Sequence, residues 1–326
     1  MTVINTQKVF PAPMAGYTDF VFRRLLRRLG VKYTFTEMIS AKALVLKNPR
    51  TLEMIEKVDR EPHTIVQLFG SEPHVMADAA RILYDKGVKK IDINMGCPQK
   101  KVVKTGAGAA LMKEPLLAAK IIKEIIRAVD IDLSVKMRLG WKEKTAPDLA
   151  HICEQEGVKF ITVHARTKTQ MFSGNAKWDE VKKVKEKINI PLIINGDIID
   201  IKTAQIALKE SSADAVMIGR AMLGQPWLIP IVEKGLSTSV KEQKDIKPII
   251  PLKRKLEIAL MHLELMEKDY NLKNIWVAKR QLSHYSHGLR YGAHFRKEIF
   301  SAKDWKEMRE LLLCLFEKNT KEYITV

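Results

Sequence analysis

The stretch Ile91-Asp92-Ile93-Asn94-Met95-Gly96-Cys97-Pro98 joins an alternating run of apolar and polar residues to a Gly-Cys-Pro turn. Apolar residues at every second position predict a strand with one buried face. Glycine and proline mark turns, and Pro98 biases Cys97 toward an extended backbone. The stretch therefore predicts a short strand that ends in a loop carrying an amide and a thiol.

Runs of the same apolar and β-branched character recur along the first 220 residues. The predicted strands are Lys8–Met14, Tyr33–Glu37, Ile65–Phe69, Lys90–Asn94, Leu133–Met137, Phe160–His164, Pro191–Asn195 and Ala215–Gly219. Between them, apolar residues at helical spacing predict helices over Ala77–Asp85, Pro115–Val129, Ala146–Glu156, Asp179–Lys187 and Lys202–Glu210. Eight strand-helix units predict an α/β fold of the TIM (β/α)8 barrel type.

Polar residues stand where such a barrel carries its chemistry, at the carboxyl ends of different predicted strands. These residues are Gln67, Asn94, Lys136, His164, Asn195 and Gly219. A doubly wound sheet would instead have a G-x-G-x-x-G turn after its first strand, and this turn is missing. We therefore expect a site at one end of a barrel.

The composition limits the compartment and the partners. A net charge of +18 and a pI near 9.6 favour a polyanionic partner, although a lysine-rich proteome would give the same balance. Three scattered cysteines form neither a disulfide framework nor a zinc site, so we expect no metal and a reducing cytoplasm, with Cys153 and Cys314 buried in helices. No apolar run reaches the roughly 18 residues of a membrane span. We expect a soluble, unexported monomer.

A second region follows the predicted barrel. The polar, proline-bounded segment Ser237–Pro251 predicts a linker, and Lys253–Asp269, Ile275–Leu289 and Lys303–Lys318 predict helices. We therefore expect a barrel domain over residues 1–240 and a helical domain over residues 241–326.

The helical region contains a basic segment. Six Lys or Arg residues and no Asp or Glu lie between Lys273 and Lys297, interleaved with aromatic and histidine residues. Such cations would contact RNA phosphates, and aromatic faces could stack on bases. We expect RNA contacts at Lys279, Arg280, Arg290 and Arg296. The alternative is that the aromatics form a helical core and the cations a solvated face.

Four motifs together resemble the bacterial tRNA-dihydrouridine synthases, flavoenzymes that reduce uridine in tRNA. They are Ala-Pro-Met-Ala-Gly at 12–16, Asn-Met-Gly-Cys-Pro at 94–98, His-Ala-Arg-Thr at 164–167 and Asn-Gly-Asp at 195–197. Within the family, the sequence looks most like the subgroup called dihydrouridine synthase B. The resemblance implies FMN as cofactor, NADPH or NADH as reductant, tRNA as partner, and a helical domain that helps to clamp the tRNA.

The resemblance also assigns cofactor contacts. It implies that Pro13, Met14 and Ala15 pack on the isoalloxazine, that Gln67 binds its pyrimidine edge, that Lys136 lies near N1 and O2, and that His164 lies close by. Asn195, Gly196, Asp197, Gly219 and Arg220 would bind the phosphate end, in agreement with the phosphate site that loops after the last two barrel strands often form. From the residues alone, Lys136 could instead form a structural ion pair, His164 could be a core histidine, and Gly219-Arg220 an ordinary turn.

Reduction of uracil places a hydride at C6 and a proton at C5. The resemblance assigns the proton to Cys97, whose thiol is mostly protonated at neutral pH. Asn94 could pair with the imide edge of the uracil, and Lys100 and Arg166 would rim the barrel mouth and guide RNA. Cys97 could also be a nucleophile or an inert buried thiol. Two rival functions remain, a flavin barrel acting on a free pyrimidine or other enone, and an RNA-binding barrel without catalysis.

Overall fold

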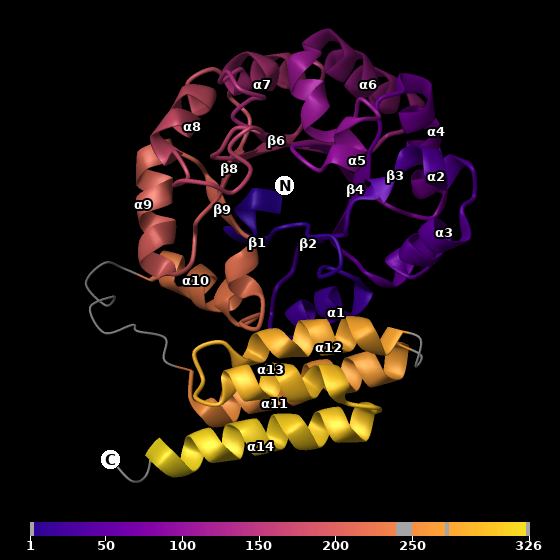
Figure 1. Ribbon diagram of the computed structural model, residues 1–326. Helices are drawn as coiled ribbons and strands as arrows, with labels where there is room; N and C mark the ends of the chain where they lie inside the picture. The colour runs from indigo at the N-terminus through magenta and orange to yellow at the C-terminus, as the bar shows by residue number, and fades with distance from the viewer. Residues whose placement is uncertain (1–2, 239–249, 271–273, 324–326) are drawn as a thin grey trace.

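A computed structural model of the chain describes residues 3–238, 250–270 and 274–323. Parallel strands form a ring that helices surround, and a separate group of helices packs against one side of the ring (Figure 1). This arrangement confirms the predicted TIM barrel followed by a helical region. None of the helices in the described ranges is long and apolar enough to cross a membrane.

The strands follow the predicted runs closely. They are β1 (Val9–Pro11), β2 (Thr34–Phe35), β3 (Ile39–Ser40), β4 (Thr64–Phe69), β5 (Lys90–Met95), β6 (Asp132–Arg138), β7 (Phe160–His164), β8 (Leu192–Asn195) and β9 (Ala215–Ile218). Neighbours around the ring run in the order β1-β9-β8-β7-β6-β5-β4-β2. The predicted strand Tyr33–Glu37 is shorter than expected, and β2 and β3 both pair with β4.

The ring closes between β1 and β2 through a side chain. Among the described residues no ladder joins these two strands, and Gln7 takes its place. Its Oε1 accepts the N–H groups of Lys32 and Tyr33 at 3.0 and 2.7 Å, and its Nε2 donates to the carbonyls of Tyr33 and Val9 at 3.0 and 2.9 Å. Gln7, Tyr33 and Val9 are buried, so the bonds to Tyr33 and Val9 satisfy backbone groups that water cannot reach.

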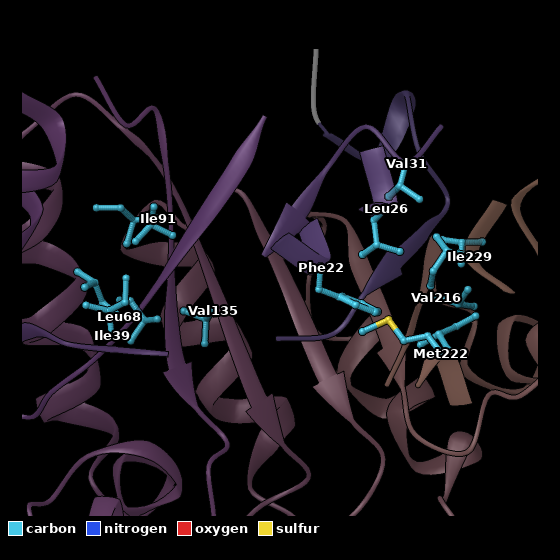
Figure 2. Close-up of a cluster of buried hydrophobic side chains, with 14 of the residues drawn as sticks. Phe22, Leu26, Val31, Ile39, Leu68, Ile91, Val135, Val216, Met222 and Ile229 are labelled. Atoms are coloured by element: carbon cyan, nitrogen blue, oxygen red, sulfur yellow. The ribbon is translucent and has the colours of Figure 1, made fainter. Parts of the chain in front are cut away.

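Side chains that alternate along each strand divide the core in two. Outward residues pack under the surrounding helices, and Figure 2 shows Leu68, Ile91 and Val135 in this layer. Inward residues fill the ring, among them Phe10, Phe35, Ile65, Ile193 and Met217, together with Val3 and Ile4 of the short 3-10 helix Val3–Asn5. This apolar plug closes the amino-terminal end of the ring and leaves the carboxyl end for polar residues.

Helices cover the outside of the ring. They are α1 (Phe20–Arg28), α2 (Ala41–Val45), α3 (Pro49–Glu56), α4 (Pro73–Asp85), α5 (Lys100–Val103), α6 (Pro115–Ala128), α7 (Ala146–Gln155), α8 (Trp178–Lys185), α9 (Ile201–Ser211) and α10 (Leu228–Ser237). The five predicted helices of this part are confirmed as α4, α6, α7, α8 and α9, with ends that differ by a few residues.

The helical region consists of α11 (Leu252–Asp269), α12 (Ile275–Ser283), α13 (Gly292–Ser301) and α14 (Trp305–Tyr323). The predicted single helix Ile275–Leu289 is wrong, because α12 ends at Ser283 and a 3-10 turn follows. Gly288 and Tyr291 both have positive φ, which no continuous α-helix allows, and α13 begins after them. Most of the predicted linker, the boundary at residues 240 and 241, and Lys273 lie outside the described residues.

The expectation for one of the cysteines is also wrong. Cys153 is buried in α7 as predicted, but Cys314 is exposed on α14. The buried face of α14 is formed by Met308, Leu312 and Phe316, and Cys314 does not lie on it. Helical spacing places Cys314 in an apolar stretch but does not determine which face of the helix is covered.

We predict that Gln7→Met lowers the free energy of unfolding by about 3 kcal/mol, because it leaves the buried N–H and carbonyl of Tyr33 without these partners. Urea unfolding followed by circular dichroism measures the change. The matched control is Gln155→Met on the exposed side of α7, for which we expect a change within about 0.5 kcal/mol. Equal losses in the two variants would contradict the proposed closure.

Candidate active site

A cavity of about 810 Å³ opens at the carboxyl ends of the barrel strands. It is lined by all the predicted cofactor residues, and by Cys97, Asn94 and Arg166. Those cofactor residues are Pro13, Met14, Ala15, Gln67, Lys136, His164, Asn195, Gly196, Asp197, Gly219 and Arg220. The predicted RNA contacts Lys100, Lys279, Arg280, Arg290 and Arg296 do not line it.

The loop after β5 is folded around the side chain of Asn94. Its Oδ1 accepts the N–H groups of Gly96 and Cys97 at 3.1 and 2.8 Å, a turn in which the amide mimics backbone. From the other side, the N–H of Ala109 donates to the Cys97 carbonyl at 3.0 Å. A Cβ on Gly108 would lie 2.8 Å from that carbonyl oxygen, so glycine is required for this close approach. The loop is thus held so that the thiol lines the cavity.

Hydrogen bonds tie this loop to a buried carboxylate. Asn94 Nδ2 donates to Gln67 Oε1 at 2.9 Å, and Gln67 Nε2 donates to Asp92 Oδ2 at 2.8 Å. Ser134 Oγ donates to the other oxygen of Asp92 at 2.7 Å. A carboxylate only accepts, so it fixes the orientation of the Gln67 amide, which in turn fixes that of Asn94. Burial raises the pKa of Asp92 to about 6.

Lys136 projects from β6 into the cavity. Its Nζ donates to Asn195 Oδ1 at 3.1 Å, while Asn195 Nδ2 donates to the Met217 carbonyl at 2.8 Å. Burial, followed by the charge of Arg138, lowers the pKa of Lys136 to about 8. The ammonium makes no ion pair with a carboxylate in the described part of the chain, which disfavours a purely structural ion pair.

The loop after β8 organises two arginines. Asp197 accepts hydrogen bonds from both terminal nitrogens of the Arg166 guanidinium, and its Oδ1 lies 3.6 Å from Arg220 Nη2. Partial burial raises the pKa of Asp197, but hydrogen bonds from Arg166 and the Ala176 N–H outweigh it, and the net shift is downward. Gly196 has φ +119, and a Cβ there would lie 2.9 Å from His164 Cδ2. The loop therefore needs glycine to pass His164.

His164 lies among cations and is neutral. Burial is the main reason that its pKa falls well below the usual range, and the positive charges of Lys136, Arg138, Arg166 and Arg220 add to the effect. The same cations make the mouth of the cavity strongly positive, with Asp197 as a partial counter-charge. Such a site suits an anionic ligand with a planar ring.

Two side chains that line the cavity were not predicted from the sequence. Arg138 donates to the Gly96 carbonyl at 2.9 Å and lies two residues beyond Lys136, so strand alternation could have revealed it. Phe172 is 47% exposed at the mouth, with the Arg220 guanidinium 4.7 Å from its ring centroid. It stands in an irregular polar loop, where no periodic signal exists.

The predicted RNA contacts are spread over the surface. Lys100 is exposed on α5, Arg290 is exposed beside Tyr291, Lys279 Nζ donates to the Phe300 carbonyl, and Arg296 donates to Ser286 Oγ. The aromatics divide between the two alternatives. Tyr285 and Phe295 are buried in the helical region, whereas Trp276 and Tyr291 are exposed.

Comparison with known proteins places the chain among relatives. A family model described as dihydrouridine synthase matches residues 10–321. A probable tRNA-dihydrouridine synthase of Rickettsia bellii is 41% identical over 298 residues, covering 90% of each chain. The tRNA-dihydrouridine synthase B of Escherichia coli K12 is 35% identical over 313 residues, covering 95% of this chain and 96% of its own.

A solved structure supports the fold alone. A 2-naphthoyl-CoA reductase in complex with 2-naphthoyl-CoA superposes with a TM-score of 0.54 at 13% identity, over 70% of this chain and 50% of the other. Because the family model spans nearly all of the described barrel and helical region, and the two relatives match over at least 90% of each chain, the chain belongs to the dihydrouridine synthase family.

Proposed function

We propose that the protein is a tRNA-dihydrouridine synthase that binds FMN in the cavity and reduces the C5=C6 bond of specific uridines in tRNA. One observation carries the proposal. The Cys97 thiol and a group of cations from other strands line the same cavity, at the end of the barrel where chemistry occurs. The names of the two relatives support tRNA as the substrate.

The residues of the cavity fit FMN. Arg220 and the backbone of Gly196 and Gly219 suit its phosphate, because glycine admits close approach and arginine adds charged donors. Lys136 suits the N1 side of the ring, where negative charge gathers on reduction. When bound and reduced by NADPH or NADH, FMN would supply the hydride to C6 of the uracil.

Cys97 is suited to give the proton to C5. Burial raises the pKa of its thiol, and the nearby Arg138 and Lys136 reduce that rise without cancelling it. A nucleophilic cysteine needs the opposite shift, so the raised pKa supports the role of an acid. Exposure to the cavity also argues against an inert thiol.

Asn94 and Arg166 make contacts within the protein that bear on their roles. Asn94 accepts loop N–H groups at its oxygen, while its Nδ2 donates to Gln67 of β4 and to Met38 Sδ at 3.8 Å. We infer that it positions Cys97, and that a uracil carbonyl would replace the weak sulfur acceptor of Met38 at its second N–H. Arg166 is buried against Asp197, so we infer that it holds the phosphate loop rather than RNA. Contacts to tRNA would then fall to Lys100 and to the basic residues of the helical region.

The proposal predicts that purified protein incubated with FMN, NADPH and tRNA lacking dihydrouridine will form dihydrouridine, measured by mass spectrometry of the nucleosides. Free uridine should not be reduced at a comparable rate. Reduction of free uridine as fast as tRNA would instead favour a small-enone reductase. Failure to bind flavin, with tRNA binding retained, would favour an RNA-binding protein without catalysis.

For Cys97→Ala we expect the rate of dihydrouridine formation to fall by about 10²–10⁴-fold, the usual contribution of a general acid, with FMN affinity unchanged. Single-turnover reoxidation of the reduced flavin by tRNA measures it. Cys314→Ala, which removes an exposed thiol on α14, is the matched control and should keep the native rate. A native rate in Cys97→Ala would rule out the acid role.

FMN binding should depend on pH through Lys136. Its lowered pKa means that the ammonium is present below a pH of about 8 and lost above it, so affinity should hold below that pH and weaken above it. Quenching of flavin fluorescence gives the Kd. Lys136→Met should weaken binding by about 10–100-fold at pH 7 and remove this alkaline dependence. An alkaline weakening that persists in Lys136→Met would assign it to another group.

A further inference from the structure

In the turn between β1 and α1, the N–H and the carbonyl of Gly16 are both hydrogen-bonded to side chains. Gly16 donates its N–H to Glu37 Oε1 and accepts a hydrogen bond at its carbonyl from Arg280 Nη2. Glu37 follows β2 in the barrel, whereas Arg280 belongs to α12 of the helical region. Gly16 has φ +79, and a Cβ there would collide with the Arg280 guanidinium. The turn is therefore built to receive this arginine.

Arg280 is half-buried and contacts the turn. Its guanidinium carbon lies 4.7 Å from the centroid of the Tyr17 ring, so one face is covered by that ring. Its Nε is buried and has no hydrogen-bond partner among the described residues. An arginine that served mainly to contact RNA phosphates would expose these donors. The RNA contact expected from the sequence stays a prediction, and the contacts described for Arg280 are with the barrel turn.

Other residues of the helical region contact the same part of the barrel. His284 Nε2 lies 3.3 Å from the Tyr17 hydroxyl, and Gln281 Nε2 donates to Asp19 Oδ2 at 3.2 Å. Gly224, in the turn after β9, packs so closely on the His284 carbonyl that a Cβ would lie 2.2 Å from its oxygen. In Figure 1, α12 lies along the side of the ring where α1 is. The helical region therefore braces two turns that form cavity walls.

We propose that Arg280 is a positioning residue of the cavity, which together with Glu37 fixes the β1–α1 turn and so the wall made by Met14, Ala15 and Tyr17. The helical region then completes the cofactor site in addition to any contact with tRNA. The inference deepens the proposed function, because it takes FMN as the ligand of that wall. Its structural part can be measured without flavin.

The test compares Arg280→Met with Lys279→Met. Lys279 is the neighbouring cation on α12, and its Nζ donates to the Phe300 carbonyl, away from the turn. In the flavin-free protein, we expect Arg280→Met to speed hydrogen exchange at the Gly16 amide by about tenfold, through easier opening of the turn. It should also raise the FMN Kd about tenfold and shift the visible spectrum of bound flavin. Lys279→Met should leave exchange, Kd and spectrum as in the native protein.

Arg280→Lys separates the charge from the planar guanidinium. It keeps a cation near Tyr17 but not the fork, so we expect exchange intermediate between the native protein and Arg280→Met. This variant decides the question if Arg280→Met fails to fold. Native exchange and a native flavin Kd in whichever arginine variant folds would overturn the proposal, as would equal effects of Lys279→Met.

The two proposals fail in different ways. If the native protein bound no flavin and formed no dihydrouridine, the proposed function would be wrong, while the exchange of the Gly16 amide would still report on the turn. If the native protein were active and Arg280→Met lost only tRNA affinity, with exchange and flavin Kd unchanged, Arg280 would be an RNA contact and the positioning role would be wrong.

Discussion

The buried carboxylate of Asp92 is the constraint on which the thiol side of the cavity depends. It sits between neighbouring strands and accepts one hydrogen bond from β4 and one from β6. A buried charge is tolerable only with such partners, so the amide of Gln67 has one favoured orientation, and Asn94 follows it. The position of Cys97 therefore depends on Asp92, through the side chains of Gln67 and Asn94.

On the opposite side of the cavity, cations are in excess over carboxylates. There, Arg166 and Arg220 lie against the partly exposed carboxylate of Asp197, and Lys136 donates to the nearby Asn195. Burial lowers the pKa of both His164 and Lys136, and the positive charge of neighbouring cations lowers both pKa values further. An anionic ligand would offset the repulsion between these cations, and this favours the binding of an anion.

Much of this arrangement was accessible from the sequence because parallel strands repeat with a period of two and end at one edge. That rule located Lys136, His164 and Asn195 correctly on the cavity wall. It could not locate Gln7, whose side chain replaces a strand ladder, or Phe172, which stands in an irregular loop. The charge pattern of the helical region gave no sign of the hydrogen bond from Arg280 to Gly16, because such a pattern does not reveal which cation is turned inward.

The pairing of β1 with β9 has a consequence for synthesis. Val9 is paired in register with Val216, so the strand of the ring that is translated first waits for the strand of the ring that is translated last. The turn that follows β1 waits longer still, for α12. The part of the cavity wall that is translated first is thus the part that is finished last.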